Sequence, residues 1–472
     1  MKKFLLLAVL FAGFALSSTV DYKAQFLGAY YSGNYETAHE LLPKAFSEPT
    51  TEAIWEDRIH YYHDFQQCQL HKTDSEAAQA LAYLRIGDFA KATSEFGKDW
   101  LSLVGLATYK SWENDMPAAQ KAAKEALVLA PDRSETVFLA GNLADSDDEA
   151  MTFFGKYLGM PEEDELKKEA AKDALAFLKK TRGIKINQAS LLAEPKKFDT
   201  HFNDGHLVIR GRVNDKQDIK LLVDTGASGL SLVDRDWSPK VVSDLAMVGL
   251  GREQISQGKI IVFDRLIVGN FALQNAVAAV SPTFHPSGFD GVTGTILFSD
   301  YAVLAPLTEG KDFALLPASD DPVADLEAHG AHFASKTTLP FYLVNKMIIL
   351  KGRVRNSDDQ LDFLLDTGAA QSLLAEATAR RLMNVNFISS LHARGGTQLY
   401  GLGGALGPQF SADNVDIKIG ALHNSYKKVA VVNLSQISEA LELEIDMILG
   451  EDFLTGYTLL IDYPHNKITF LK

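Results

Sequence analysis

The chain has 472 residues, more than one ordinary hydrophobic core organises, so two or more domains are expected. Hydrophobic residues make up 46% and charged residues 23% of the chain, an ordinary globular balance. The formal net charge of −15, without any long basic run, excludes nucleic acid and acidic membrane surfaces as partners bound through bulk charge. Cys68 is the only cysteine, which excludes an intramolecular disulfide and a multi-cysteine metal site.

The N-terminus is typical of a secretory signal peptide over residues 1–17. Lys2 and Lys3 form a short positive region, residues 4–16 are an apolar run, and small residues follow at the positions that signal peptidase recognises. The run is shorter than the roughly 20 apolar residues that span a bilayer, which favours cleavage near Ser17 over an uncleaved anchor. We therefore predict an exported protein, periplasmic or secreted, with no membrane span after cleavage.

The segment over residues 21–183 has alanine and leucine at three- and four-residue spacing, which predicts helices. Residues 29–38 and 82–92 share one order: a helix ending at glycine, a polar residue, an aromatic residue and a second helix. The glycine suits the left-handed conformation that closes a helix, and the aromatic residue is expected to pack between the paired helices. Pro131 is expected to stop a further helix. The segment resembles tetratricopeptide repeats without a constant period. It is either a generic helical domain that packs on the rest of the chain or a surface that binds a protein partner.

From about residue 196 onward, short β-rich runs separated by Gly, Asn and Asp predict an all-β region. Its decisive feature is an internal duplication. Residues 207–213 and 347–354 each predict a first strand, a polar turn follows, and a second strand ends in Asp-Thr-Gly at Asp224 and at Asp366. The chain therefore holds two copies of one β unit.

The correspondence between the copies continues downstream. Three further pairs of segments match in the same order, namely 247–251 with 399–403, 266–269 with 415–420, and 290–297 with 446–454. A final hairpin is expected in each copy, with Pro306 interrupting the last strand of the first. We predict two lobes, 196–317 and 341–472, joined by a looser linker at 318–340. Each lobe is expected to close its own core, so that a fragment containing only the lobes folds alone.

Each copy resembles a retropepsin-type lobe, and the pair resembles the two-lobed aspartic peptidases. The fold class this implies is an all-α helical-repeat N-terminal domain followed by an all-β, two-lobed pepsin/retropepsin-like domain. By the resemblance, Asp224 and Asp366 are the catalytic pair, and Thr225 and Thr367 tie the two active-site loops together across the lobe interface.

Two carboxyl groups in one site supply both proton transfers that amide hydrolysis needs. Like charges about 3 Å apart do not both ionise, so the pair holds one proton; the aspartic proteases are the best-known case of this effect. The ionised member takes a proton from water, and the protonated member donates toward the carbonyl oxygen. Gly226 and Gly368 let the backbone approach the carboxylates closely. The sequence thus predicts an aspartic endopeptidase acting on extracytoplasmic proteins or peptides, with no metal and no cofactor.

Two further details concern the pH range and the substrate. Ala227 and Ala369 follow the glycines, where the pepsin side of the family usually has serine, and the missing hydroxyl predicts a pair that titrates at higher pH than in strongly acid-active relatives. Tyr400 and Gly401 are candidates for a flap that closes over an extended peptide. A plain glycine turn with an inward-facing aromatic ring is the alternative for this phrase.

Two other interpretations of the whole chain stay open. The first is a non-catalytic peptide- or protein-binding module with a peptidase-like cleft, although the retention of both aspartates argues against it. The second treats the helical region as a regulatory or removable segment. The 12 histidines show no spacing suited to a metal.

Overall fold

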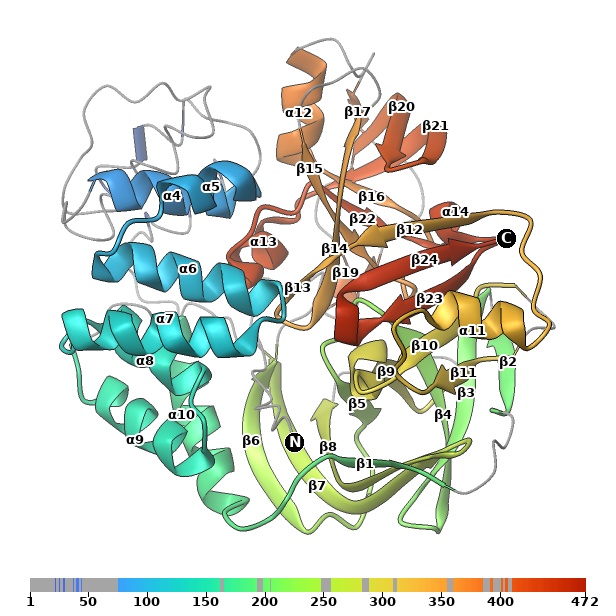
Figure 1. The fold of residues 1–472 in the computed structure, drawn as a ribbon, viewed down its shortest axis with the longest axis horizontal. Helices are drawn as coiled ribbons and strands as arrows, with labels where there is room; N and C mark the ends of the chain where they lie inside the picture. The colour runs from blue at the N-terminus through green and yellow to red at the C-terminus, as the bar shows by residue number, and fades with distance from the viewer. Residues whose placement is uncertain are drawn as a thin grey trace.

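In the computed structural model, two β lobes pack beside a column of helices (Figure 1). The signal peptide, most of the first helical phrase and the glycine-rich phrase of the first β copy lie outside the described residues. Apart from isolated positions between 22 and 44, those residues are 75–161, 165–192, 198–203, 205–247, 256–281, 288–308, 312–354, 360–384, 391–393, 400–401, 404–405 and 410–472. No helix among them is long and apolar enough to cross a membrane.

The described part of the N-terminal region is helical, as predicted. Gly87 closes the first helix with φ of +77°, and Asp88 then caps the next by accepting a hydrogen bond from the Lys91 N–H. Buried alanines line the facing sides of the later helices, which allows close packing. The helices are α4 (Ser75–Arg85), α5 (Phe89–Glu95), α6 (Trp100–Trp112), α7 (Met116–Leu129), α8 (Ser134–Asn142), α9 (Asp147–Leu158) and α10 (Glu165–Lys180).

Lobe 1 is built on a nine-stranded sheet, green in Figure 1. Its strands are β1 (Gln188–Leu191), β2 (Thr200–Asn203), β3 (His206–Val213), β4 (Gln217–Asp224), β5 (Leu230–Val233), β6 (Val241–Met247), β7 (Ser256–Val268), β8 (Phe271–Ser281) and β9 (Gly291–Gly294), followed by the 3-10 helix η1 (Thr295–Phe298).

Lobe 2 is built on an eight-stranded sheet, orange to red in Figure 1, with a separate two-stranded ribbon. Its elements are β13 (Tyr342–Val344), β14 (Met347–Val354), β15 (Leu361–Leu365), β16 (Leu373–Ala375), α12 (Glu376–Asn384), β17 (Leu391–Ala393), β18 (Tyr400–Gly401), β19 (Gly404–Ala405), β20 (Phe410–Ile419), β21 (Leu422–Val432), α13 (Ser435–Leu441), β22 (Met447–Leu449) and α14 (Glu451–Leu454).

The same strand pairing recurs in both lobes. In lobe 1, β4 pairs parallel with β9, β9 pairs antiparallel with β5, and β5 pairs parallel with β8. In lobe 2, β15, β22, β16 and β21 repeat these three pairings in the same order and direction. The duplication predicted from the sequence is therefore confirmed in the topology, and the two-lobed all-β architecture with it.

A third sheet, of five strands, joins the lobes. Its order is β11-β10-β23-β24-β12, so that β10 of lobe 1 pairs with β23 of lobe 2. Both predicted final hairpins, β10–β11 and β23–β24, are present in it. The added elements are β10 (Ala302–Pro306), β11 (Ala314–Leu316), α11 (Pro322–Ala328), β12 (Lys336–Pro340), β23 (Thr458–Asp462), the 3-10 helix η2 (Tyr463–His465) and β24 (Lys467–Leu471).

Two sequence-based expectations about this region need correction. Pro306 ends β10 opposite Thr458 and does not interrupt the strand, because a residue without an N–H is tolerated at a strand end. The stretch 318–340 is not a loose linker, since it forms α11 and contributes β12 as an edge strand along β24.

The helical region shares hydrophobic cores with both lobes, contrary to the expectation that each lobe closes its core alone. Phe177 of α10 packs into a cluster with residues of β6, β7 and β8. A larger cluster joins helices α4 to α6 to lobe 2; its members include Leu84, Phe89, Tyr109 and Trp112 from the helices and Val344, Ile349, Leu364 and Leu373 from the lobe. Sequence periodicity shows that a helix has an apolar face but not what covers that face.

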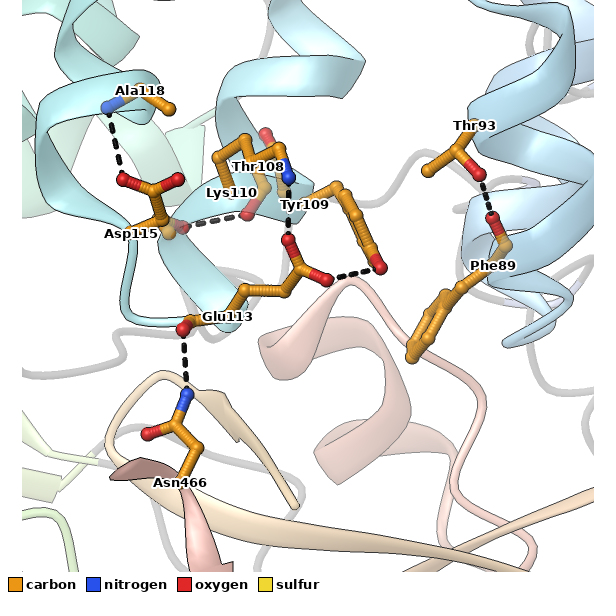
Figure 2. Close-up of polar contacts among 10 residues, drawn as sticks. Phe89, Thr93, Thr108, Tyr109, Lys110, Glu113, Asp115, Ala118 and Asn466 are labelled. Atoms are coloured by element: carbon orange, nitrogen blue, oxygen red, sulfur yellow. Dashed lines mark hydrogen bonds and ion pairs between the residues drawn. The ribbon is translucent and has the colours of Figure 1, made fainter. Parts of the chain in front are cut away.

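Polar contacts fix the same junction. Figure 2 shows Asn466 at the β23–β24 turn donating from Nδ2 to the Glu113 carbonyl oxygen at 2.6 Å, while the Glu113 carboxylate accepts from Tyr109 Oη at 2.5 Å. The Glu444 N–H donates to the Arg85 carbonyl oxygen at 2.8 Å. The helical region therefore meets lobe 2 with matched backbone groups as well as apolar surface.

Candidate active site

The two aspartates occupy equivalent places in the two lobes. Asp224 is the last residue of β4, and Asp366 directly follows β15. Both strands are central in their sheets, between an antiparallel hairpin partner and a parallel neighbour. Their apolar side chains are buried, so the chain leaves the core at the carboxylate and turns back.

Reciprocal hydrogen bonds between two buried threonines join the loops. The Thr225 N–H donates to Thr367 Oγ1 and the Thr367 N–H donates to Thr225 Oγ1, each at 3.1 Å. Each hydroxyl in turn donates into the opposite lobe, Thr225 Oγ1 to the Leu365 carbonyl at 2.7 Å and Thr367 Oγ1 to the Val223 carbonyl at 2.9 Å. These bonds join the two Asp-Thr-Gly loops across the lobe interface.

The glycines bring each carboxyl group onto the opposite loop. A Cβ at Gly226 would lie 2.7 Å from Asp366 Cγ, and a Cβ at Gly368 would lie 2.7 Å from Asp224 Cγ. No larger residue fits at either place without displacing a carboxyl group. The Gly226 N–H donates to Asp224 Oδ1 at 2.7 Å, and the Gly368 N–H donates to Asp366 Oδ1 at 2.8 Å. Each carboxyl group therefore lies against the glycine of the opposite loop, which brings Asp224 and Asp366 into one site.

The two carboxyl groups have different surroundings. Asp224 is 7% exposed, whereas Asp366 is more exposed. Burial, followed by the negative charge of Asp366, raises the pKa of Asp224 well above its usual range. Burial also raises the pKa of Asp366, but hydrogen bonds from Asp224 and from the backbone N–H groups of Gly368 and Ala369 oppose that shift. Burial thus favours retention of a proton by the pair, and the backbone N–H groups favour the ionised form at Asp366.

A raised pKa predicts a specific effect of Asp224→Asn on stability. The folded protein binds this proton more tightly than the unfolded chain, so the favourable contribution is complete below about pH 3.9, the ordinary aspartate pKa, and is lost as pH rises through the folded-state value. Asparagine never ionises, so the variant should unfold at a higher temperature than wild type at pH 8 and at a similar temperature at pH 3. Thermal unfolding followed by circular dichroism tests this.

The control for this measurement is Asp132→Asn, because the Asp132 side chain is 95% exposed. That variant should follow the wild-type curve at both pH values. Equal unfolding temperatures for wild type and Asp224→Asn at pH 8 would contradict the electrostatic description of the pair.

The candidate flap residues lie in the short ribbon of β18 and β19, where Tyr400 pairs with Ala405 and Gly401 with Gly404. The ribbon confirms a tight hairpin in the backbone, while the Tyr400 side chain lies outside the described part. The matching phrase of the first copy, between β6 and β7, also lies outside it. The flap role stays a prediction.

Two functional candidates were missed in the sequence. His206 Nδ1 of lobe 1 lies 2.8 Å from Glu451 Oε1 of lobe 2, beside the Asp366 loop. The available signal was a difference between the copies: Gly450 is followed by Glu451, whereas Gly294 is followed by Thr295. Within the described residues, no group of three or more His, Cys, Asp or Glu side chains is placed to hold a metal ion.

Comparison with known proteins gives limited information. No family model matches the sequence, and no curated protein matches it. Solved structures do match, among them the aspartic proteinase from Irpex lacteus, which aligns over 60% of this chain and 97% of its own with 13% sequence identity and a TM-score of 0.37. At this level of similarity, functional interpretation depends on the loops and carboxyl groups of the chain itself.

Proposed function

We propose that the protein is an aspartic endopeptidase that hydrolyses peptide bonds of extracytoplasmic proteins or peptides by activating water between Asp224 and Asp366. The observation that carries the proposal is the approach of the two carboxyl groups, each over the glycine of the opposite loop. Two equivalent strands deliver them and reciprocal threonine bonds hold the loops in register. An ordinary Asp-Thr-Gly turn needs none of this.

The geometry suits a water molecule attacking a carbonyl carbon. The ionised carboxylate accepts a proton from the water as its oxygen bonds to the carbon, and the protonated carboxyl group donates its proton to the carbonyl oxygen. A tetrahedral diol results. Its C–N bond then breaks as the amine nitrogen takes the proton held by the pair, while a hydroxyl group of the diol returns a proton to the other carboxylate, which restores the singly protonated state.

Digestion of a peptide library by the purified protein tests the proposal. Cleavage products should form without added cofactor, and a transition-state mimic with a hydroxyl group in place of the scissile carbonyl should inhibit their formation. A chelator should leave the rate unchanged, and loss of activity with a chelator would overturn the mechanism. If the protein binds peptides tightly but cleaves none, it is the non-catalytic binding module instead.

The rate should depend on pH in a bell shape, because the pair works only while it holds one proton. Ala227 and Ala369 carry no hydroxyl that would stabilise the ionised form, and burial raises the pKa of both aspartates. We expect the optimum of kcat/KM at mildly acidic to near-neutral pH. An optimum confined to strong acid would contradict this expectation.

The proposal includes export and a role for the helices. The apolar run at residues 4–16 supports a periplasmic or secreted location, which N-terminal sequencing of the mature protein would test. A tetratricopeptide-like surface that docks a protein partner is proposed for the faces of α4–α10 that the lobes leave uncovered. The faces that contact the lobes are committed to the shared cores.

A further inference from the structure

An ion pair crosses the lobe interface beside the candidate catalytic carboxyl groups. His206 begins β3 in lobe 1 and Glu451 begins α14 in lobe 2; His206 Nδ1 lies 2.8 Å from Glu451 Oε1, and each side chain is 18% exposed. Gly205 leaves room for the carboxylate, since a Cβ there would lie 2.9 Å from Glu451 Oε2. The pair is thus built into the interface rather than exposed on the surface.

The ion pair is attached to the loop that carries Asp366. The Glu451 N–H donates to the Ala369 carbonyl oxygen at 2.8 Å. The backbone of Thr367 and the charge of Asp366 both contribute to raising the pKa of His206, so the imidazole lies near this loop. The ion pair is therefore anchored three positions from Asp366 through Glu451, and the positive charge of a protonated His206 acts on the Asp366 carboxyl group.

Among the described residues, the positions in the other copy that correspond to His206 and Glu451 are uncharged. In a sequence alignment of the two copies that matches Gly211 with Gly352 and Gly294 with Gly450, Met347 corresponds to His206 and Thr295 corresponds to Glu451. Thr295 Oγ1 is hydrogen-bonded to Tyr463 Oη at 2.6 Å, and both side chains are buried. Thr295 thus takes part in a neutral hydrogen bond, whereas Glu451 at the corresponding place in lobe 2 takes part in an ion pair.

We propose that the His206–Glu451 pair positions the proton of the dyad, holding Asp366 as the ionised base and leaving the proton on Asp224 as the acid. This rests on the proposed function, which it deepens by giving the two aspartates separate roles. Water then loses its proton to Asp366 while Asp224 protonates the carbonyl oxygen. Neither His206 nor Glu451 touches the reacting atoms, so both are positioning residues.

The electrostatics of the described residues agree with this arrangement. The charged groups acting on His206 are Glu451 and Asp366; the adjacent carboxylate of Glu451 raises the pKa of His206 despite its burial. In turn, the charge of His206 acts to lower the pKa of Asp366. His206 therefore stays protonated through the mildly acidic range and loses its charge as pH rises through its raised pKa.

Kinetics of His206→Gln give the first test. Without the positive charge, Asp366 holds its proton more strongly, so the acid limb of the kcat/KM profile should move to higher pH while KM changes little. At pH values where wild-type His206 is neutral, the two profiles should converge. Glu451→Gln should move the acid limb in the same direction, because it removes the group that keeps His206 protonated.

His465→Gln is the matched control. His465 Nδ1 pairs with Asp462 Oδ2 at the same 2.8 Å, but this pair lies in the turn after β23. Its profile should coincide with that of wild type. An acid limb that does not move in His206→Gln would overturn the proposal, and so would an equal movement in His465→Gln.

A titration without substrate separates this proposal from the proposed function. The histidine signals are followed by NMR against pH, and that of His206 is assigned by its absence in His206→Gln. Because linkage is reciprocal, Asp366→Asn should lower the pKa of His206 more than Asp224→Asn does. Equal effects of the two variants would overturn the proton assignment even in an active enzyme. A protein that cleaves no peptide would refute the proposed function while this titration still decides the role of His206.

Discussion

Asp224→Asn and Asp366→Asn are each expected to lower kcat/KM for peptide hydrolysis by about 10⁴-fold, the upper end of what general acid–base groups contribute. Asparagine holds no exchangeable acidic proton and cannot accept one from water, so either change leaves the site with one of its two proton transfers. The hydrogen bonds of Thr225 and Thr367 do not involve the carboxylates, and the loops should remain joined.

Rates measured on a peptide identified from the library, together with circular dichroism spectra of both variants, check this result. Asp132→Asn serves as the surface control and should keep wild-type activity, because its side chain is 95% exposed. Appreciable turnover in either dyad variant, with the fold intact, would refute the assignment of the pair. Loss of activity caused by unfolding would show in the spectra.

Phe89→Ala is expected to destabilise the protein by about 3–5 kcal/mol, the range found for removing buried aromatic side chains. Phe89 packs edge-on against Tyr342 of lobe 2 with ring centroids 4.4 Å apart, and against Trp112 of α6 at 5.7 Å. The Lys351 ammonium group lies 3.7 Å from the centre of the same ring. The truncation leaves a cavity at the junction between the helices and lobe 2.

Chemical denaturation of the full chain measures this effect, with Val128→Ala as the control. Val128 is 80% exposed on α7, so its truncation should change the free energy of unfolding by less than about 0.5 kcal/mol. A fragment of residues 196–472 should be far less stable than the full chain, because it exposes Ile349 and Leu364. A fragment as stable as the full chain would contradict the shared core.

The shared core also bears on the proposal of a removable segment. Excision of the helices would uncover apolar surface on both lobes, at Leu245 and Val262 in lobe 1 as well as at the lobe 2 junction. The helical region is therefore better described as a permanent part of the folded protein. The mass of the mature protein should include it.

The sequence predicted the lobes well because their signals are local. A buried strand that ends in Asp-Thr-Gly has a recognisable pattern, and its recurrence before Asp224 and Asp366 predicted the hairpin that precedes each aspartate and the candidate dyad. Contacts between residues far apart in the chain were not predicted, because no local sequence pattern indicates them. Phe89 was predicted to pack between paired helices. The structure shows that it also packs against Tyr342, which lies more than 250 residues later in the chain.

The ion pair between His206 and Glu451 could not be predicted from the sequence for a related reason. His206 begins a strand that carries no motif, and the glycine that precedes Glu451 is followed by threonine in the other copy. Nothing in the spacing of the two residues indicates that they meet. Only the packing of lobe 1 against lobe 2 brings the imidazole and the carboxylate together.

The reciprocal threonine bonds have a consequence for how such a chain can evolve. Thr225 and Thr367 each donate a hydrogen bond to the backbone of the opposite half of the duplicated sequence. A substitution at either threonine would therefore remove a hydrogen bond from the other half. Elsewhere the two halves differ in sequence; His206 in the first half, for example, corresponds to Met347 in the second. At the threonines the two halves keep the same residue, and replacing either one would remove hydrogen bonds from both halves.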